Sequence, residues 1–333
     1  MDLALVSAAV IALGVLVYIV LDGFDLGIGV LFAVAPDAEA RATMMNTVAP
    51  VWDGNETWLI LGGAVLFASF PQAYAVALPA LYIPLMLMLF ALVFRGVSFE
   101  LRFKAENPRP WDFAFAVGST VAAFMQGAML GGLVQGIKVE NGAFAGGPFD
   151  WLTPLAIASG LGVVVGYGLL GACWLVLKTE GELQARARAW GRWLAVAVLI
   201  AMGVVSLITP LGHPQVAARW FSGLNFLYFA PVPAAALVAA FLLWRGLGRG
   251  AERAPFFLAA LLFLFGYAGI GISLWPYIVP YALTIWAAAA PPSSQVFTLV
   301  GVAIALPMVG LYTVYAYRVF RGKVRAGEGY HAH

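Results

Sequence analysis

Two pairs of acidic residues lie within or at the edge of apolar stretches of the chain. Asp22 and Asp25 belong to the first stretch, and Asp53 and Glu56 begin the second. Each pair is spaced i, i+3, so its members share one face of a helix. A carboxylate in hydrocarbon is costly, and it commonly marks a proton or ion path or a contact with a partner. We therefore expect these four acids to form a proton route.

Charged residues at the end of the third apolar stretch suggest a structural alternative. Arg95 closes that stretch, and Glu100 and Arg102 follow it. An arginine paired with Asp22 or Asp53 would hold three helices together, because ionisable groups in membrane spans pair with one another. We expect Arg95, Glu100 and Arg102 to form such structural ion pairs, and we favour the proton route for the four acids.

The residues around the acids predict that these side chains are buried against protein. Gly23 and Gly27 have the small-xxx-small spacing that allows two membrane helices to approach closely. The segment 52–58 gathers polar and aromatic side chains at the start of one helix, where they could order a water chain. The aromatic residues Tyr315 and Tyr317 are typical of an interfacial belt, and we assign them no catalytic role.

The chain contains few residues that bind metals or haem. Its three histidines are His213, in a short loop, and His331 and His333, at the C-terminus. Haem between membrane helices needs an axial histidine inside a span, so we expect no haem on this chain alone. Copper and zinc sites are excluded in the same way. The single cysteine, Cys173, excludes a disulfide framework and a cysteine metal cluster.

The composition predicts a membrane protein. Hydrophobic residues make up 63% of the 333 residues and charged residues only 10%, against about 25% charged in soluble domains. A bilayer needs roughly 20 apolar residues per helix. Nine stretches reach that length, at about 4–33, 51–70, 75–98, 113–137, 151–178, 191–211, 222–246, 256–286 and 296–320. We predict an all-α polytopic protein with about nine transmembrane helices in one membrane domain, residues 1–333.

The basic residues predict the orientation of these helices. With the N-terminus outside, only Lys138 and Arg219 of the 18 lysines and arginines lie outside. Cytoplasmic loops carry an excess of lysine and arginine. This distribution therefore indicates an N-out, C-in topology. Two prolines, Pro276 and Pro280, should bend or unwind the outer end of the eighth stretch.

Three motifs in order along the chain resemble subunit II of the cytochrome bd-type quinol oxidases. They are the segments 22–27 (Asp-Gly-Phe-Asp-Leu-Gly), 51–59 (Val-Trp-Asp-Gly-Asn-Glu-Thr-Trp-Leu) and 94–102 (Phe-Arg-Gly-Val-Ser-Phe-Glu-Leu-Arg). The pair Glu56-Thr57 and the compact loops are closer to the cyanide-insensitive branch of that family. The resemblance extends over the whole chain, in both its length and its number of apolar stretches.

The resemblance implies a fold, a partner and a reaction. It implies bd-oxidase-like helical bundles in the bacterial cytoplasmic membrane and pairing with a subunit I that carries the b-type haems and a d-type haem, or a b-type haem in its place. The complex would oxidise quinol and reduce O₂ to water. Asp53 matches a residue of the cytoplasmic proton route, and Asp22 and Asp25 match the aspartates of the first motif. A bound quinone, with Trp52 as a possible contact, and small single-span subunits are further expectations.

Two other functions remain as alternatives. A proton- or ion-coupled secondary transporter could use the same acids as coupling sites, but such folds often have inverted repeats and interrupted helices, and the sequence has neither. A purely structural membrane subunit would share the assembly and lack the proton route. Quinol, O₂ and the lipid bilayer are the expected partners, and nucleic acid is not.

Overall fold

The computed structural model describes residues 2–325, so His331 and His333 lie outside the described residues. Within that range the chain is almost entirely helical. The helices are α1 (Leu3–Phe32), α2 (Ala38–Asn46), α3 (Trp52–Ser69), α4 (Pro71–Ala80), α5 (Tyr82–Leu101), α6 (Arg109–Gln135), α7 (Pro154–Lys178), α8 (Gly181–Gly212), α9 (Pro214–Phe221), α10 (Asn225–Phe229), α11 (Pro231–Gly248), α12 (Ala254–Leu274) and α13 (Pro292–Val319). Two short antiparallel hairpins complete it, β1 (Val139–Glu140) with β2 (Ala143–Phe144) and β3 (Tyr277–Val279) with β4 (Leu283–Thr284).

The long helices confirm the prediction of an all-α polytopic membrane protein. Among the described residues, 8 helical segments are long and apolar enough to cross a membrane. The remaining predicted stretch, 51–70, forms α3, whose 18 residues include the polar side chains of Asp53, Asn55 and Glu56 in the first turns. These side chains lower its hydropathy, yet α3 packs against α1 and α13 within the bundle. The predicted stretch 75–98 is divided between α4 and α5.

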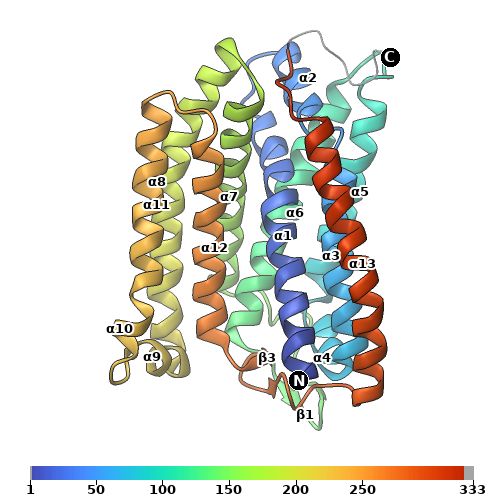
Figure 1. Ribbon diagram of the computed structural model, residues 1–333, viewed down its shortest axis with the longest axis vertical. Coiled ribbons are helices and arrows are strands. Elements are labelled where there is room, and N and C mark those ends of the chain that lie inside the picture. The colour runs from blue at the N-terminus through green and yellow to red at the C-terminus, as the bar shows by residue number, and fades with distance from the viewer. Residues whose placement is uncertain (1, 326–333) are drawn as a thin grey trace.

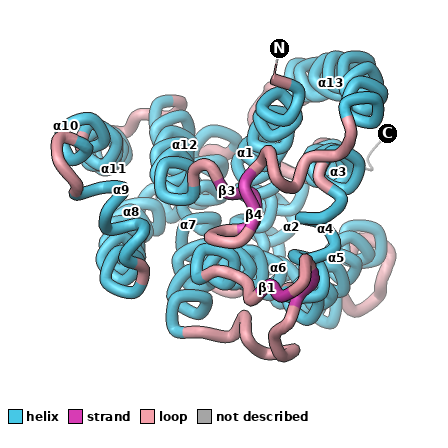
Figure 2. Tube along the Cα trace, turned by 90° about the horizontal axis from the view of Figure 1, so that it is seen from below, coloured by secondary structure: helices cyan, strands magenta, loops and turns pink. Residues whose placement is uncertain are grey.

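Helices α1, α6 and α7 form the centre of the bundle. Helix α1 packs on α3, α6 and α7, and α7 packs in turn on α6, α8 and α12. Viewed from below, α8, α10 and α11 lie on one side of α1, and α3 and α13 lie on the other (Figure 2). Any charged side chain on the inner face of α1 is therefore surrounded by protein.

Small residues allow these central helices to touch. A Cβ atom built on Gly27 would overlap the backbone carbonyl of Tyr167, and one built on Gly171 would meet the backbone of Gly27 at 2.5 Å. A Cβ on Gly23 would lie 2.7 Å from the Tyr167 ring. The close helix approach predicted at Gly23 and Gly27 is thus confirmed, and it occurs against α7.

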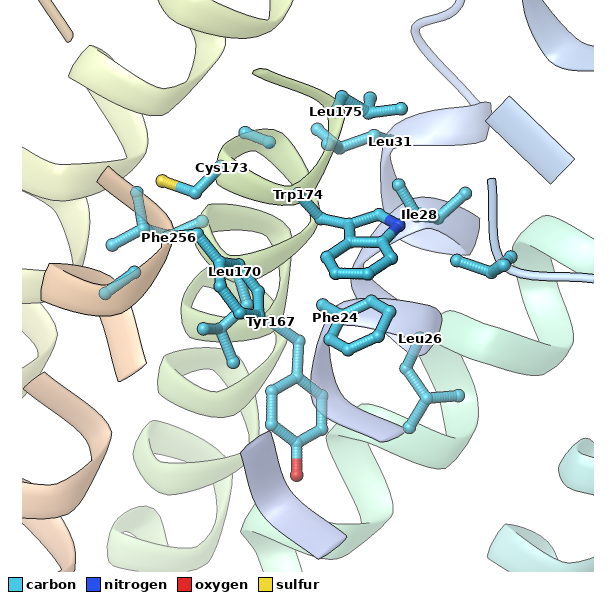
Figure 3. Packing of buried hydrophobic residues seen from close by; sticks show 14 of the residues in the cluster. Phe24, Leu26, Ile28, Leu31, Tyr167, Leu170, Cys173, Trp174, Leu175 and Phe256 are labelled. Carbon is cyan, nitrogen blue, oxygen red and sulfur yellow. The ribbon is translucent and has the colours of Figure 1, made fainter. Parts of the chain in front are cut away.

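Aromatic side chains fill the space next to this crossing (Figure 3). The Phe24 ring stacks on Trp174, with ring centroids 4.1 Å apart and an interplanar angle of 19°. The rings of Phe256 and Tyr317 pack edge-to-face with Phe24, with centroid distances of 5.6 and 6.4 Å. Stacked and edge-to-face pairs of this kind add to the free energy of burial, so the segment of α1 that carries the acids is firmly packed.

Loops rich in basic residues meet at the end of the bundle that contains α2 (Figure 1). There Lys178 donates hydrogen bonds to the carbonyl oxygens of Phe320 and Gly322. Lys323 lies 2.9 Å from Glu252, and the hydrogen bonds from Lys323 and from Gln184 hold the pKa of the exposed Glu252 carboxyl below its usual range. Most of the predicted inner loops therefore share one end, and an N-out topology remains a prediction.

The opposite end contains the N-terminus, both hairpins and the short helices α9 and α10 (Figure 1). Helix α12 ends at Leu274, and the chain then forms the β3–β4 hairpin instead of a further helical turn. The expected unwinding at Pro276 and Pro280 is thereby confirmed. A proline lacks the N–H that helix continuation needs.

Candidate functional site

The Arg95 guanidinium is the centre of a buried charge cluster. Its Nη1 lies 2.8 Å from Asp22 Oδ1 and 2.9 Å from Glu56 Oε1. Its Nη2 lies 3.8 Å from Asp25 Oδ2. The three acids come from α1 and α3 and the arginine from α5, so one cation joins three helices. We call Asp22, Asp25, Glu56 and Arg95 the Arg95 cluster.

The Arg95 cluster contains more acids than bases. The side chains of Arg95, Asp22 and Asp25 are at most 1% exposed, whereas that of Glu56 is 26% exposed. Ionisation of all three acids would leave two charges uncompensated in a medium of low dielectric constant, which is strongly unfavourable. The cluster is therefore suited to retain a proton that the acids share. Glu56 is the member that reaches the surface.

An amide and a phenol extend the cluster toward α13. Asn55 Nδ2 donates to Asp25 Oδ2 at 2.7 Å, and the Tyr317 hydroxyl donates to Asn55 Oδ1 at 2.9 Å. The prediction of a belt role for Tyr317 is therefore wrong, because its hydroxyl bonds inward. No sequence signal distinguished it from Tyr315, since both lie near the C-terminal end of the same apolar helix, α13.

Asp53 and Trp52 lie beside the cluster and outside its ion pairs. Asp53 is exposed in the first turn of α3 and forms no ion pair among residues 2–325. We expected an arginine to pair with either Asp22 or Asp53, and in the structure Arg95 pairs with Asp22. The Trp52 ring stacks on Phe99 at 4.9 Å with an interplanar angle of 9°. The Arg95 guanidinium lies 5.8 Å from the centroids of both rings.

Glu100 and Arg102 form ion pairs away from the cluster. Arg102 Nε lies 2.5 Å from Asp112 Oδ1, and Arg41 lies 3.5 Å from the other oxygen of the same carboxylate. This pairing joins the α5 end to α6 and α2. Glu100 pairs with Lys104 at 3.0 Å, with both side chains more than 60% exposed. An exposed pair of this kind adds little to stability, so the structural role fits Arg102 and not Glu100.

A second polar group lies one helical turn from Asp22, and the sequence analysis missed it. The Tyr167 hydroxyl donates to Gln126 Oε1, and Gln126 Nε2 donates to the Tyr18 hydroxyl oxygen, both at 2.7 Å. These residues come from α7, α6 and α1. The only sequence signal was Gln126, an isolated amide within the predicted stretch 113–137.

Comparison with known proteins identifies the family of this chain. Residues 3–320 match the family described as cytochrome bd terminal oxidase subunit II. The chain is 30% identical to cytochrome bd-I ubiquinol oxidase subunit 2 of Escherichia coli K12 over 352 aligned residues, which cover 92% of this chain and 91% of that protein. It is also 30% identical to a probable cytochrome oxidase subunit 2 of Haemophilus influenzae, with the same coverage.

The fold has a solved counterpart as well. A chain in the structure of bd oxidase from Geobacillus thermodenitrificans superimposes with a TM-score of 0.81 and 19% sequence identity, covering 96% of this chain and 99% of that one. The identity is low, so this match speaks for the fold. Together with the family match over nearly the whole chain, it supports the resemblance seen in the three motifs. This chain belongs to the cytochrome bd terminal oxidase subunit II family.

Proposed function

We propose that this chain supports a haem-bearing subunit I and carries protons from the cytoplasm toward the site of O₂ reduction. As a subunit II it is part of a quinol-oxidising oxidoreductase complex in a membrane, and the family does not favour the transporter alternative. The observation that carries the proton role is the Arg95 cluster, in which three acids share one buried cation. A group of acids that holds a proton in low dielectric can relay it.

The proposed route begins at Asp53. This exposed carboxylate lies one turn before Glu56 on α3. Glu56 is partly exposed and already bonded to Arg95, so it connects the surface to Asp22 and Asp25. Water would carry the proton between acids that do not touch. In the proposed N-out, C-in topology, the route opens toward the cytoplasm.

We assign the haems of the complex, b-type and d-type or b-type in its place, to the partner subunit. His213 is the histidine within residues 2–325. It lies between α8 and α9 at the end of the bundle that contains the N-terminus, with its ring 5.8 Å from that of Tyr281. That position offers no imidazole to the interior of the bundle. Residues 2–325 therefore offer no histidine that fits axial haem ligation inside the bundle.

A quinone is a further ligand that we propose for this subunit. The stacked rings of Trp52 and Phe99 lie beside Arg95. A planar quinone ring can stack on an aromatic face, and Trp52 is the partly exposed ring of this pair, whereas Phe99 is buried. Trp52 remains the residue that we propose to contact it, in a complex of the bacterial cytoplasmic membrane that could also include small single-span subunits.

The haem assignment predicts a colourless chain. Expressed alone and purified in mild detergent, this subunit should show no haem absorption. Expressed together with its partner subunit, it should co-purify with a larger chain that accounts for all the haem. Absorption spectra and mass identification of the co-purified chains provide the measurement. Stoichiometric haem in the isolated chain would contradict the proposal.

Replacing Asp53 by asparagine tests the proton route. Asp53 forms no ion pair within the described chain, so Asp53→Asn should leave assembly and the haem spectrum intact. Asparagine forms hydrogen bonds but does not titrate, so O₂ consumption per haem should fall by about 10²-fold, a common contribution of general acid–base groups.

The matched control for this variant is Glu39→Gln. Glu39 is an exposed acid in the first turn of α2, near the same end of the bundle. Its replacement should leave turnover unchanged. Wild-type turnover in assembled Asp53→Asn oxidase would exclude the relay through Asp53, and failure of that variant to assemble would favour a purely structural role.

A further inference from the structure

Tyr167, Gln126 and Tyr18 form a directed series of hydrogen bonds in the centre of the bundle. The Tyr167 hydroxyl donates to the Gln126 carbonyl oxygen, and the Gln126 amide nitrogen donates to the Tyr18 oxygen. Tyr18 and Tyr167 are only 3% and 2% exposed. Water does not compete at such buried sites, so the series holds each hydroxyl in one orientation.

The series leaves one hydrogen without an acceptor. The Tyr18 oxygen accepts from Gln126, so its own hydrogen remains to be donated. Asp22 lies four residues further along α1, on the same helix face, and its carboxylate interacts with the Tyr18 hydroxyl.

One carboxylate oxygen of Asp22 lacks a hydrogen-bond donor. Its Oδ1 is bonded to Arg95, whereas its Oδ2 is buried and receives no hydrogen bond within ordinary distance and angle limits. Buried carboxylate oxygens nearly always have a donor. A donor without an acceptor and an acceptor without a donor thus face each other across one turn of α1.

We propose that Tyr18 is a positioning residue for Asp22, and that its hydroxyl, held by Gln126 and Tyr167, donates to Asp22 Oδ2. This inference rests on the proposed proton route and adds to it. The contact keeps the carboxylate turned toward Arg95 while its proton occupancy changes. A hydrogen bond from a phenol to a carboxylate is also stronger than one between two neutral groups.

The phenol acts among several charged and titratable groups. Those that face Asp22 are Arg95 from α5, Glu56 from α3, Tyr167 from α7, Tyr317 from α13, and Asp25 and Tyr18 on α1 itself. Tyr18 and Gln126 carry no charge at neutral pH. Removing the Tyr18 hydroxyl therefore leaves the number of charges unchanged and takes one hydrogen-bond donor away from Asp22.

The test is Tyr18→Phe in the assembled oxidase. The ring and its packing remain, and only the hydroxyl is lost. The acid limb of the pH profile of O₂ consumption per haem should move to higher pH by about one unit, as expected for the loss of one hydrogen bond to a carboxylate. Tyr267→Phe is the matched control. It also removes one phenol hydroxyl that bonds to α1, but the Tyr267 hydroxyl donates to the backbone carbonyl of Ala12, at 3.0 Å, and not to an acid. This control should keep the wild-type profile.

Infrared difference spectroscopy gives a second readout, which does not depend on turnover. A carboxyl band that disappears in Asp22→Asn should shift in Tyr18→Phe and stay in place in Tyr267→Phe. With isotope-labelled tyrosine in otherwise unchanged oxidase, a tyrosine band should respond to pH and lose that response in Asp22→Asn. This labelled experiment decides the question if Tyr18→Phe does not assemble.

The outcomes separate this inference from the proposed function. If Asp53→Asn and Asp22→Asn lose turnover while Tyr18→Phe keeps both the wild-type pH profile and the wild-type carboxyl band, the positioning role is overturned and the proton route stands. If Asp53→Asn and Asp22→Asn retain wild-type turnover, the proton route itself fails. A shifted band in Tyr18→Phe would then still establish the contact with Asp22.

Discussion

Replacing Arg95 by leucine is expected to abolish the assembled oxidase. The guanidinium is completely buried and is the cation shared by Asp22, Asp25 and Glu56. Removing one partner of a buried ion pair costs about 3–5 kcal/mol, because the charge left behind is uncompensated. Here three acids lose their partner together, and α5 loses its polar link to α1 and α3. The measurement is the yield of haem-containing complex from membranes, by absorption spectrum and by immunoblot of this subunit.

A second substitution separates the charge from the packing. In the double variant Arg95→Leu with Asp22→Asn, one buried negative charge is removed, so part of the yield should return. Arg102→Leu is the matched control, because Asp112 keeps a second cation, Arg41, at 3.5 Å. Its loss of yield should be smaller. A normal yield of Arg95→Leu, or no recovery in the double variant, would contradict charge compensation as the function of Arg95.

The positions of the acids along the helices were predictable, and their pairing was not. The spacing of Asp22 and Asp25 places both on one face of α1, and the nearby glycines predict that this face meets another helix. Which arginine they meet depends on how α5 packs against α1. Helix pairing depends on contacts between distant segments, and one sequence contains no direct record of them. The structure provides Arg95 for this role.

The different surroundings of Asp53 and Glu56 show where a spacing argument ends. Residues three apart on a helix differ by roughly 60° in direction, so they share a face without sharing an environment. The longer Glu56 side chain reaches Arg95, whereas Asp53 remains on the exposed edge of α3. The helical periodicity predicts that Asp53 and Glu56 share a face, but it does not predict that only Glu56 reaches Arg95. An isolated acid at a helix start gives no sign of whether it points inward.

Tyr18 and Tyr317 were missed for a related reason. A tyrosine in a membrane helix has the same sequence signature whether its hydroxyl faces lipid headgroups or a buried acid. Only the folded structure distinguishes the two cases. It shows that Tyr18 accepts a hydrogen bond from Gln126 and that Tyr317 donates one to Asn55. The polar residues of the site thus come from six helices, α1, α3, α5, α6, α7 and α13, and the three motifs cover parts of only the first three.

Replacing Gly27 by alanine is expected to dismantle the centre of the bundle. A Cβ atom at this position would overlap the Tyr167 carbonyl oxygen and press on Gly171, and both obstacles are backbone atoms that cannot rotate away. Overpacking in a close-packed interior costs about 1–3 kcal/mol and at times more, and here α1 must move away from α7. Since α1 carries Asp22 and Asp25, the same movement would pull the Arg95 cluster apart.

Thermal stability and turnover together test this expectation. The yield of Gly27→Ala oxidase should fall sharply, and any purified complex should unfold at a lower temperature and consume O₂ more slowly per haem. Gly63→Ala is the matched control, because no heavy atom lies within 4 Å of a Cβ built on Gly63 of α3. Alanine also favours helix more than glycine does, by about 1 kcal/mol, so Gly63→Ala should assemble at least as well as the wild type. Equal yields and unfolding temperatures for the two variants would mean that α1 and α7 can separate without cost, and that the packing at Gly27 does not hold the acids in place.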